Sequence, residues 1–296
     1  MNTASRVFVC GGDTLVGATL VRRLKAEGFA NLVGVGNDEP DPTDAAEVGR
    51  FFAATRPEYV FVAAGKSGGI GLNRERPADL MLDNLRVATS VVPAAHTFGV
   101  AKLLYLASSC AYPRDAAQPL AVESLATGPM EPTSEAYSTA KLAGWKLCDA
   151  FRRQHGCRFV TGFPANAFGP DDDFSEAGGH VIPALMCRAH EAKLAGDAEL
   201  VVWGTGGPRR EFVYADDLAD ACVFAMRHYN GDAPIILGAG TDLSIAEVAQ
   251  AVCEVVGFRG QLAFDRTRPD GAPLKRLDSG PLLAMGWRPR TEFRDA

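Results

Sequence analysis

The segment "RVFVCGGDTLVGATLVRRLKAEG" (residues 6–28) decides the fold that the sequence predicts. Its apolar start, residues 6–10, is typical of a buried strand, and residues 15–28 follow the period of an amphipathic helix that ends at Gly28. The glycines of "GGDTLVG" (residues 11–17) allow a tight turn that brings backbone N–H groups toward a phosphate at the helix N-terminus. Alone, this loop fits an ordinary strand-to-helix turn as well, because Thr14 replaces the middle glycine of the usual G-x-x-G-x-x-G spacing.

The remainder of the first half repeats this alternation. Further strands are predicted at residues 31–35, 59–64, 102–108 and 158–163, and helices at residues 43–57, 77–98 and 134–155. Apolar strands separated by helices are typical of a parallel sheet covered on both faces. We therefore expect an α/β fold, a Rossmann-type doubly wound parallel sheet, whose first loop binds a dinucleotide.

The pattern loosens after residue 167. A Gly/Asp-rich loop, "GPDDDFSEAGGH" (residues 169–180), precedes a predicted helix at 181–194 and a strand at 199–203. A capping box, "SIAE" (residues 244–247), opens another helix. We expect a dinucleotide-binding Rossmann domain over residues 1–167. Residues 168–296 should form a smaller C-terminal substrate-binding lobe, with residues 205–240 or so returning to the Rossmann domain.

Composition narrows the possible partners. The net charge of −6 argues against a general affinity for nucleic acid or an anionic membrane, and the 296 residues contain no apolar stretch long enough to predict a membrane span. The seven cysteines are scattered and odd in number, with no C-x-x-C pair, so neither a metal site nor a disulfide framework is expected. This pattern fits a cytoplasmic protein. Six of the cysteines are interpreted as small buried residues, and Cys110 is the exception.

A second motif carries chemistry. "EAYSTAK" (residues 135–141) places Tyr137 and Lys141 on one face of a predicted helix. We expect the ammonium to stabilise the phenolate and lower the pKa of Tyr137, so that the phenol can donate and accept a proton. Ser108, at the end of a predicted strand, can bind the same substrate oxygen. The alternative is a surface helix pair, but the serine and the upstream glycine loop favour a catalytic site.

Longer blocks resemble one family. They are "AAGKSGGIGLNRERPADLMLDN" (63–84), "KLLYLASSCAYP" (102–113), "EPTSEAYSTAKLAGWKLC" (131–148), "GGHVIPAL" (178–185), "RREFVYADDLADA" (209–221) and "PDGAPLKRLD" (269–278). In these blocks the sequence resembles the GDP-L-fucose synthases, nucleotide-sugar epimerase–reductases among the extended short-chain dehydrogenases/reductases. The resemblance implies epimerisation at C3 and C5 of a GDP-4-keto-6-deoxy-mannose-type sugar, followed by reduction of the C4 ketone to give GDP-L-fucose.

The resemblance also implies the catalytic roles. Cys110 is the base and His180 the acid of the epimerisations, while Tyr137 protonates the C4 oxygen with help from Lys141 and Ser108. A thiol with a pKa near 8.5 is easily tuned toward neutrality beside cations, which suits it to remove a proton next to a ketone. For His180 the alternative is a purely structural histidine.

The glycine loop and the resemblance also indicate which residues bind the cofactor and the substrate. The loop and the resemblance together imply cofactor contacts from Gly11, Gly12, Asp13, Thr14, Leu15, Val16, Gly17, Asn37, Asp38, Leu106, Ala107, Lys141, Pro164, Asn166, Ala167 and His180. The resemblance implies substrate contacts from Asn166, Arg188, Trp203, Arg210, Asp270 and Lys275. Among these, the three cations should face the GDP diphosphate.

The cofactor expectation is divided. Members of the family usually carry basic residues where this chain has Asp13 and Asn37, and those residues hold the 2′-phosphate of NADP. A carboxylate repels that phosphate, and Asp38 lies 21 residues after Gly17, near the spacing of a ribose-binding acid. The resemblance thus implies NADP(H), whereas the residues favour NAD(H).

The resemblance implies a homodimer formed through the helices near residues 78–98 and 134–155. The chain ends with "MGWRPRTEFRDA" (285–296), where relatives begin a last helix. The alternative functions are an epimerase–reductase for a related GDP-sugar of the 6-deoxy-heptose or colitose type, and a non-catalytic NAD-binding regulator, which would typically lack the Tyr/Lys pair.

Overall fold

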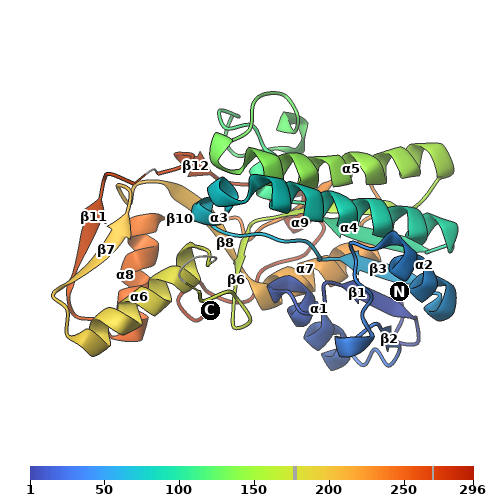
Figure 1. The fold of residues 1–296 in the computed structure, drawn as a ribbon, viewed down its shortest axis with the longest axis horizontal. Helices are drawn as coiled ribbons and strands as arrows, with labels where there is room; N and C mark the ends of the chain where they lie inside the picture. The colour runs from blue at the N-terminus through green and yellow to red at the C-terminus, as the bar shows by residue number, and fades with distance from the viewer. Residues whose placement is uncertain (176–178, 269) are drawn as a thin grey trace.

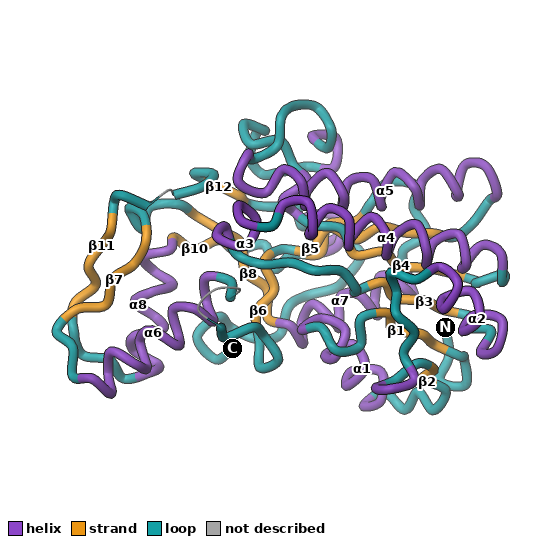
Figure 2. The backbone as a smooth tube through the Cα atoms, viewed as in Figure 1, coloured by secondary structure: helices purple, strands orange, loops and turns teal. Residues whose placement is uncertain are grey.

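The computed structural model describes residues 1–175, 179–268 and 270–296. Its main sheet has six parallel strands in the order β2-β1-β3-β4-β5-β9 (Figures 1 and 2). The strands are β1 (Val7–Cys10), β2 (Leu32–Val33), β3 (Tyr59–Val62), β4 (Lys102–Leu106), β5 (Phe159–Pro164) and β9 (Ile235–Leu237). The winding direction reverses between β1 and β3, and ligands of such sheets bind beyond the carboxyl ends of the strands at this point.

Helices cover both faces of this sheet, as the sequence predicted. On one face α1 packs against α7, and on the other α4 packs against α2 and α5 (Figure 1). The bounds are α1 (Leu15–Ala26), α2 (Ala45–Thr55), α4 (Pro77–Thr97), α5 (Glu135–His155) and α7 (Ala215–His228). One strand is shorter than expected: β2 occupies only two residues of the predicted 31–35, because Gly34 and Gly36 take positive φ angles of 66° and 69° and turn the chain.

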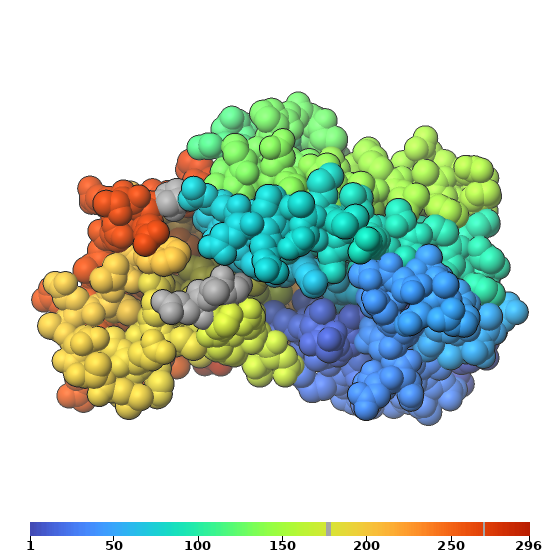
Figure 3. All heavy atoms as spheres, viewed as in Figure 1, coloured from blue at the N-terminus to red at the C-terminus, as the bar shows by residue number. Residues whose placement is uncertain are grey.

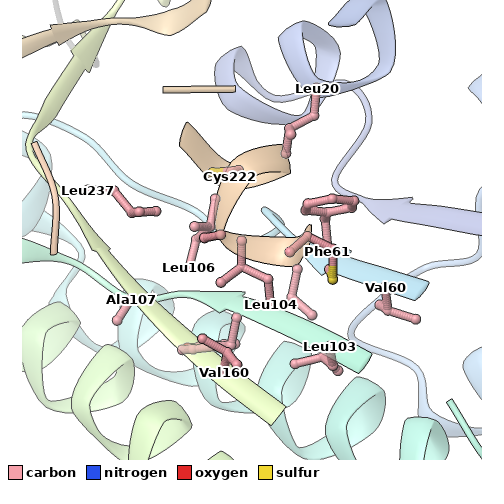
Figure 4. Packing of buried hydrophobic residues seen from close by; sticks show 14 of the residues in the cluster. Leu20, Val60, Phe61, Leu103, Leu104, Leu106, Ala107, Val160, Cys222 and Leu237 are labelled. Atoms are coloured by element: carbon pink, nitrogen blue, oxygen red, sulfur yellow. The ribbon is translucent and has the colours of Figure 1, made fainter. Parts of the chain in front are cut away.

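The core of the large sheet is apolar on both faces. Figure 4 shows Leu104 and Leu106 of β4 on the side of Cys222 from α7, while Leu103 of the same strand lies on the opposite side. This alternation follows from the period of two in a strand, and all four side chains are at most 5% exposed. Burial of a leucine of this kind contributes about 1.5–3 kcal/mol, so the sheet is a firm support for the loops at its edge.

A smaller lobe has its own apolar cluster. Here α6 (Val181–Ala195) packs against α8 (Ile245–Val256), and β7 (Glu199–Trp203) pairs with β11 (Gln261–Asp265). The predicted capping box is present, because the Ser244 hydroxyl accepts from the Glu247 amide at 3.1 Å and the Glu247 carboxylate accepts from the Ser244 amide at 2.7 Å. Figure 3 shows this yellow-to-orange lobe at one end of the molecule and the blue-to-green residues at the other.

A third sheet carries several site residues. Its strands are β6 (Asn166–Phe168), β8 (Arg209–Tyr214), β10 (Asp242–Ser244) and β12 (Leu274–Lys275), with β8 paired to the other three. Two short helices, α3 (Ile70–Glu75) and α9 (Gly280–Ala284), complete the α-helices of the described residues. Within these residues, no helix has the length and apolar character needed to cross a membrane.

Candidate functional site

The candidate site begins where β4 ends. Ser108 is the N-cap of a short 3₁₀ turn, Ser109–Ala111, and its hydroxyl accepts a hydrogen bond from the Cys110 amide at 3.2 Å. The turn places the Cys110 thiol where Lys275 reaches it, with 3.3 Å between Nζ and Sγ. Two residues separated by 165 positions in the chain thus meet at the carboxyl edge of the main sheet.

The charges around Cys110 determine its acidity. Desolvation alone would raise the pKa of the thiol. The positive charge of Lys275, hydrogen bonds from Ser108 and Lys275, and the positive charge of Arg210 together outweigh this, so the pKa of Cys110 is lowered. The expectation that cations tune this thiol toward neutrality is confirmed in direction. Its role as the base stays a prediction.

Tyr137 lies in the first turn of α5, and its hydroxyl hydrogen-bonds Ser108. Desolvation and the negative charge of Cys110 raise the pKa of Tyr137 well above that of a free phenol, although the bond to Ser108 opposes them. The expectation that Lys141 lowers this pKa is therefore wrong in this structure. Burial dominates instead, and Tyr137 remains a protonated phenol that can donate to a substrate oxygen.

Lys141 donates hydrogen bonds to neighbouring backbone carbonyls. Its Nζ donates to the carbonyl of Leu106, the last residue of β4, at 3.2 Å and to that of Ala64 at 3.4 Å. Desolvation lowers the pKa of Lys141 to about 8, against the opposing negative charges of Asp83 and Cys10. The ammonium is thus held beneath the edge of the sheet, one helical turn from Tyr137.

The glycine loop is shaped for close approach. Gly11 has φ +85°, and a Cβ there would lie 2.5 Å from the Ala64 amide nitrogen, while one on Gly17 would lie 1.8 Å from the Gly11 carbonyl oxygen. Thr14 caps α1, accepting from the Gly17 amide at 3.1 Å and donating to the Gly11 carbonyl at 2.8 Å. The loop and the start of α1 therefore offer backbone amides to an anion.

A carboxylate that the sequence analysis missed lies on this loop. Glu39 accepts hydrogen bonds from the amides of Gly11 and Gly12, the latter at 3.0 Å. The pKa of Glu39 is raised. Desolvation is the main cause and the negative charge of Asp13 adds to it, while the hydrogen bonds from the Gly11 and Gly12 amides oppose it. Amides that bind a carboxylate can also bind the oxygens of a dinucleotide, so the loop fits that class of cofactor.

Glu39 takes the place that was expected for Asp38. Asp38 is the last residue of an exposed 3₁₀ turn, Gly36–Asp38, and the turn directs the following residue toward the loop. Asn37 and Asp13 are also exposed. The motif spacing pointed to the correct turn, but the turn's geometry, which spacing does not encode, selects Glu39.

Arg210 joins the group around Cys110. It is opposite Lys275 in the β8–β12 pairing, and its Nη1 donates to the Arg209 carbonyl at 2.8 Å. Desolvation lowers the pKa of Arg210, while the negative charges of Cys110, Glu131 and Asp270 raise it. Two cations thus converge on one thiol.

A second group of predicted substrate residues surrounds Trp203. This side chain is 53% exposed, and the Arg188 and Arg268 guanidinium carbons lie 5.7 and 4.8 Å from its ring centroid. Arg268 was not among the predicted residues. Nearby in the chain, Asp270 accepts from the amide and hydroxyl of Thr205 at 2.7 and 2.9 Å. An exposed aromatic face with cations suits a nucleotide.

His180 and Asn166 lie on separate elements. His180 is the N-cap residue of α6. Near it in the chain, desolvation raises the pKa of Asp172, whereas hydrogen bonds with Ser175 lower the pKa of Asp173. Asn166 opens β6 and donates to the Glu211 carbonyl at 2.9 Å. Part of the predicted loop, residues 176–178, lies outside the described residues.

The other predicted cofactor residues gather near strand ends. Leu106 and Pro164 end β4 and β5, Ala107 follows β4, and Ala167 lies in β6. Leu15 and Val16 open α1. All seven cysteines are free, and no group of three or more His, Cys, Asp or Glu among the described residues could hold a metal ion.

The chain is similar to proteins of a known family. The model of the NAD dependent epimerase/dehydratase family matches residues 7–240. The chain is 48% identical over 292 residues to GDP-L-fucose synthase 1 of Arabidopsis thaliana, which covers 99% of this chain and 90% of that protein.

Two solved structures are also similar. A GDP-6-OMe-4-keto-L-xylo-heptose reductase from C. jejuni has a TM-score of 0.93 at 31% identity, with 100% of this chain and 96% of that chain covered. A GDP-L-fucose synthetase from Naegleria fowleri bound to NADP has a TM-score of 0.91 at 28% identity, with 100% and 92% covered. The chain therefore belongs to the NAD dependent epimerase/dehydratase family and, within it, to the GDP-L-fucose synthases.

Proposed function

We propose that this protein converts a GDP-4-keto-6-deoxy-mannose-type sugar into GDP-L-fucose by epimerising C3 and C5 and reducing C4. One observation carries the proposal: the Ser108 hydroxyl hydrogen-bonds both the Cys110 thiol, whose pKa is lowered, and the Tyr137 phenol, whose pKa is raised. A base and an acid with opposed pKa shifts thus share one hydroxyl, as a two-stage reaction at a single ketone requires.

In the first stage the ketone at C4 acidifies the protons on C3 and C5. The Cys110 thiolate takes one of these protons, and the electrons of the broken C–H bond move onto the C4 oxygen. Protonated His180 then donates to the opposite face of the same carbon, and the C4 carbonyl re-forms with that carbon inverted. After the first inversion Cys110 releases its proton to solvent water and His180 takes one up. The same two groups can then invert the other carbon that flanks the ketone.

In the second stage Tyr137 donates its proton to the C4 oxygen. Its raised pKa keeps it protonated until that moment, and Lys141 places a positive charge one helical turn away. When bound, the nicotinamide cofactor supplies the hydride that reduces C4. The N-terminus of α1 would hold its phosphates, and Glu39, fixed on the amides of Gly11 and Gly12, would face its ribose.

For the cofactor, we propose that NADH serves at least as well as NADPH. Exposed Asp13 and Asn37 offer no cation to a 2′-phosphate, and Glu39 adds a carboxylate on the Gly11 and Gly12 amides. An acidic residue at this place suits the free hydroxyls of an NAD ribose.

The substrate proposal favours the fucose pathway over a heptose. Identity to the plant fucose synthase is 48%, against 31% for the heptose reductase. The regulator alternative is disfavoured because the chain retains both Tyr137 and Lys141, one helical turn apart on α5, and Lys141 reaches the end of β4 that precedes Ser108 and Cys110. We also propose a homodimer through the adjacent helices α4 and α5, which the molar mass in solution would test.

Product analysis tests the proposed function. The protein is incubated with GDP-4-keto-6-deoxymannose and either NADH or NADPH, and the sugar is identified by NMR. We expect GDP-L-fucose, with C3, C4 and C5 all changed. Formation of a C4 alcohol with unchanged C3 and C5, or turnover of a GDP-keto-heptose alone, would contradict the proposal.

A further inference from the structure

The Lys275–Cys110 contact is built by the backbone on both sides. β12 pairs with β8 so that Lys275 stands opposite Arg210. The Gln118 side chain donates to the Leu274 carbonyl at 3.2 Å and accepts from the Arg276 amide at 3.0 Å. The segment that carries Lys275 is therefore tied to the loop that follows Cys110.

A buried carboxylate reinforces this attachment. Glu211 of β8 is 1% exposed and accepts from the amides of Leu277 and Gly240 at 2.9 and 2.8 Å, and from the Ser279 hydroxyl at 3.3 Å. Leu120 adds a second tie, because its amide donates to the Arg276 carbonyl at 2.7 Å. These bonds hold residues 274–279 in one place, so the ammonium of Lys275 stays at the thiol at little entropic cost.

The charged and titratable groups that face Cys110 come from three elements. They are Lys275 on β12, Arg210 on β8 and Tyr137 on α5, together with the hydroxyl of Ser108. Only cations and neutral donors are among them. An ammonium 3.3 Å from sulfur favours the thiolate strongly in a partly desolvated site.

We propose that Lys275 is the counter-ion that keeps Cys110 ionised, and thus a positioning residue for the epimerisation base. This rests on the proposed function, and it gives Lys275 a task within the chain besides any contact with the substrate. When the thiolate takes a proton from C3 or C5, the Lys275 ammonium stays beside the sulfur.

Titration of the thiol tests the pair without turnover. The rate at which iodoacetamide alkylates Cys110 is followed by peptide mass spectrometry against pH, in the absence of substrate. Thiolate absorbance, taken as the difference between the protein and Cys110→Ser, gives the same titration without needing reagent access. We expect an inflection below that of an ordinary thiol, about 8.5.

Substitutions of Lys275 and of a neighbouring cation test whether Lys275 causes the low inflection of the Cys110 titration. Lys275→Met should raise the inflection by about one pH unit or more, which is about a tenfold loss of alkylation rate at neutral pH. Lys275→Arg should keep the low inflection because its charge is retained. Arg276→Met, a neighbouring exposed cation paired with Asp242 at 3.8 Å, should leave it unchanged. Lys275→Gln replaces the methionine variant if that one does not fold.

An inflection at or above the ordinary value in the unmodified protein would overturn the proposal by itself. So would equal inflections in the unmodified protein and the neutral Lys275 variants. Failure of the proposed function looks different: the low inflection and its shift would persist, which supports the ion pair, while no GDP-keto-sugar would be turned over.

Discussion

Two buried lysines, Lys102 of β4 and Lys141 of α5, contact opposite ends of strand β4 and differ in their surroundings. Lys102 opens the strand and is 5% exposed, and its Nζ donates to the carbonyls of Ala225, Met226 and Tyr229 at the end of α7. Lys141 is 6% exposed and reaches the last carbonyl of the same strand. Desolvation lowers the pKa of both to about 8.

Lys102 and Lys141 have different roles because their surroundings differ. At the amino end, three carbonyls of one helix terminus saturate the Lys102 ammonium, which closes the site and complements the helix dipole. At the carboxyl end, Lys141 lies among Cys10, Asp83 and the strand ends that adjoin Ser108 and the glycine loop. A lowered lysine pKa alone therefore does not mark a functional site, whereas the open, carboxyl edge of a parallel sheet does.

The largest effect is expected at the carboxyl end, in Tyr137→Phe. Loss of the proton donor should slow reduction by about 10² to 10⁴ while leaving nucleotide affinity nearly intact. Single-turnover oxidation of the nicotinamide cofactor measures the rate, and calorimetry measures the affinity. A slowing of less than tenfold would count against Tyr137 as the acid.

The glycine loop at the same edge gives the next largest effect. In Asp13→Arg with Asn37→Arg, two charged hydrogen bonds to a 2′-phosphate become available, each worth about 1.5–3 kcal/mol. The ratio of kcat/KM values should shift toward NADPH by about a hundredfold. If the unmodified protein already prefers NADPH by about tenfold or more, another cation must bind the 2′-phosphate and the cofactor proposal is wrong.

At the amino end of β4, the substitution Lys102→Met should change stability and not activity. Lys102→Met removes the ammonium that three carbonyls share, and the free energy of unfolding should fall by about 2 kcal/mol. Urea denaturation measures this, with the exposed Lys25→Met as the matched control. The kcat of the folded fraction should not change. A gain in stability would mean that the cost of burying the charge exceeds the value of its hydrogen bonds.

The smallest effect concerns pH. Because the pKa of Lys141 is lowered to about 8, the ammonium is lost as pH rises through that value, and kcat/KM for reduction should fall about tenfold per unit above it. Lys141→Arg stays charged and should abolish this inflection, whatever its absolute rate. An unchanged profile in Lys141→Arg would assign the inflection to a different group.

The sequence predicted much of the sheet because its signal is local. The apolar runs of β1, β3, β4 and β5 and the periodic helices between them need no tertiary information. Pairings between distant segments were not predictable: β12 has two residues, and its register with β8 places Lys275 on Cys110. The pKa of Tyr137 was predicted in the wrong direction because burial, which raises it, follows from packing and not from the Tyr/Lys spacing.

Solvent exchange tests the central claim, that Cys110 is the base of a first stage separate from reduction. The unmodified protein, Cys110→Ser, Tyr137→Phe and the control Cys157→Ser are incubated with the 4-keto sugar in deuterated water, and NMR follows deuterium at C3 and C5. We predict rapid exchange in the unmodified protein, the control and Tyr137→Phe, with a loss of about a hundredfold or more in Cys110→Ser. Exchange at the unmodified rate in Cys110→Ser would remove Cys110 from the mechanism.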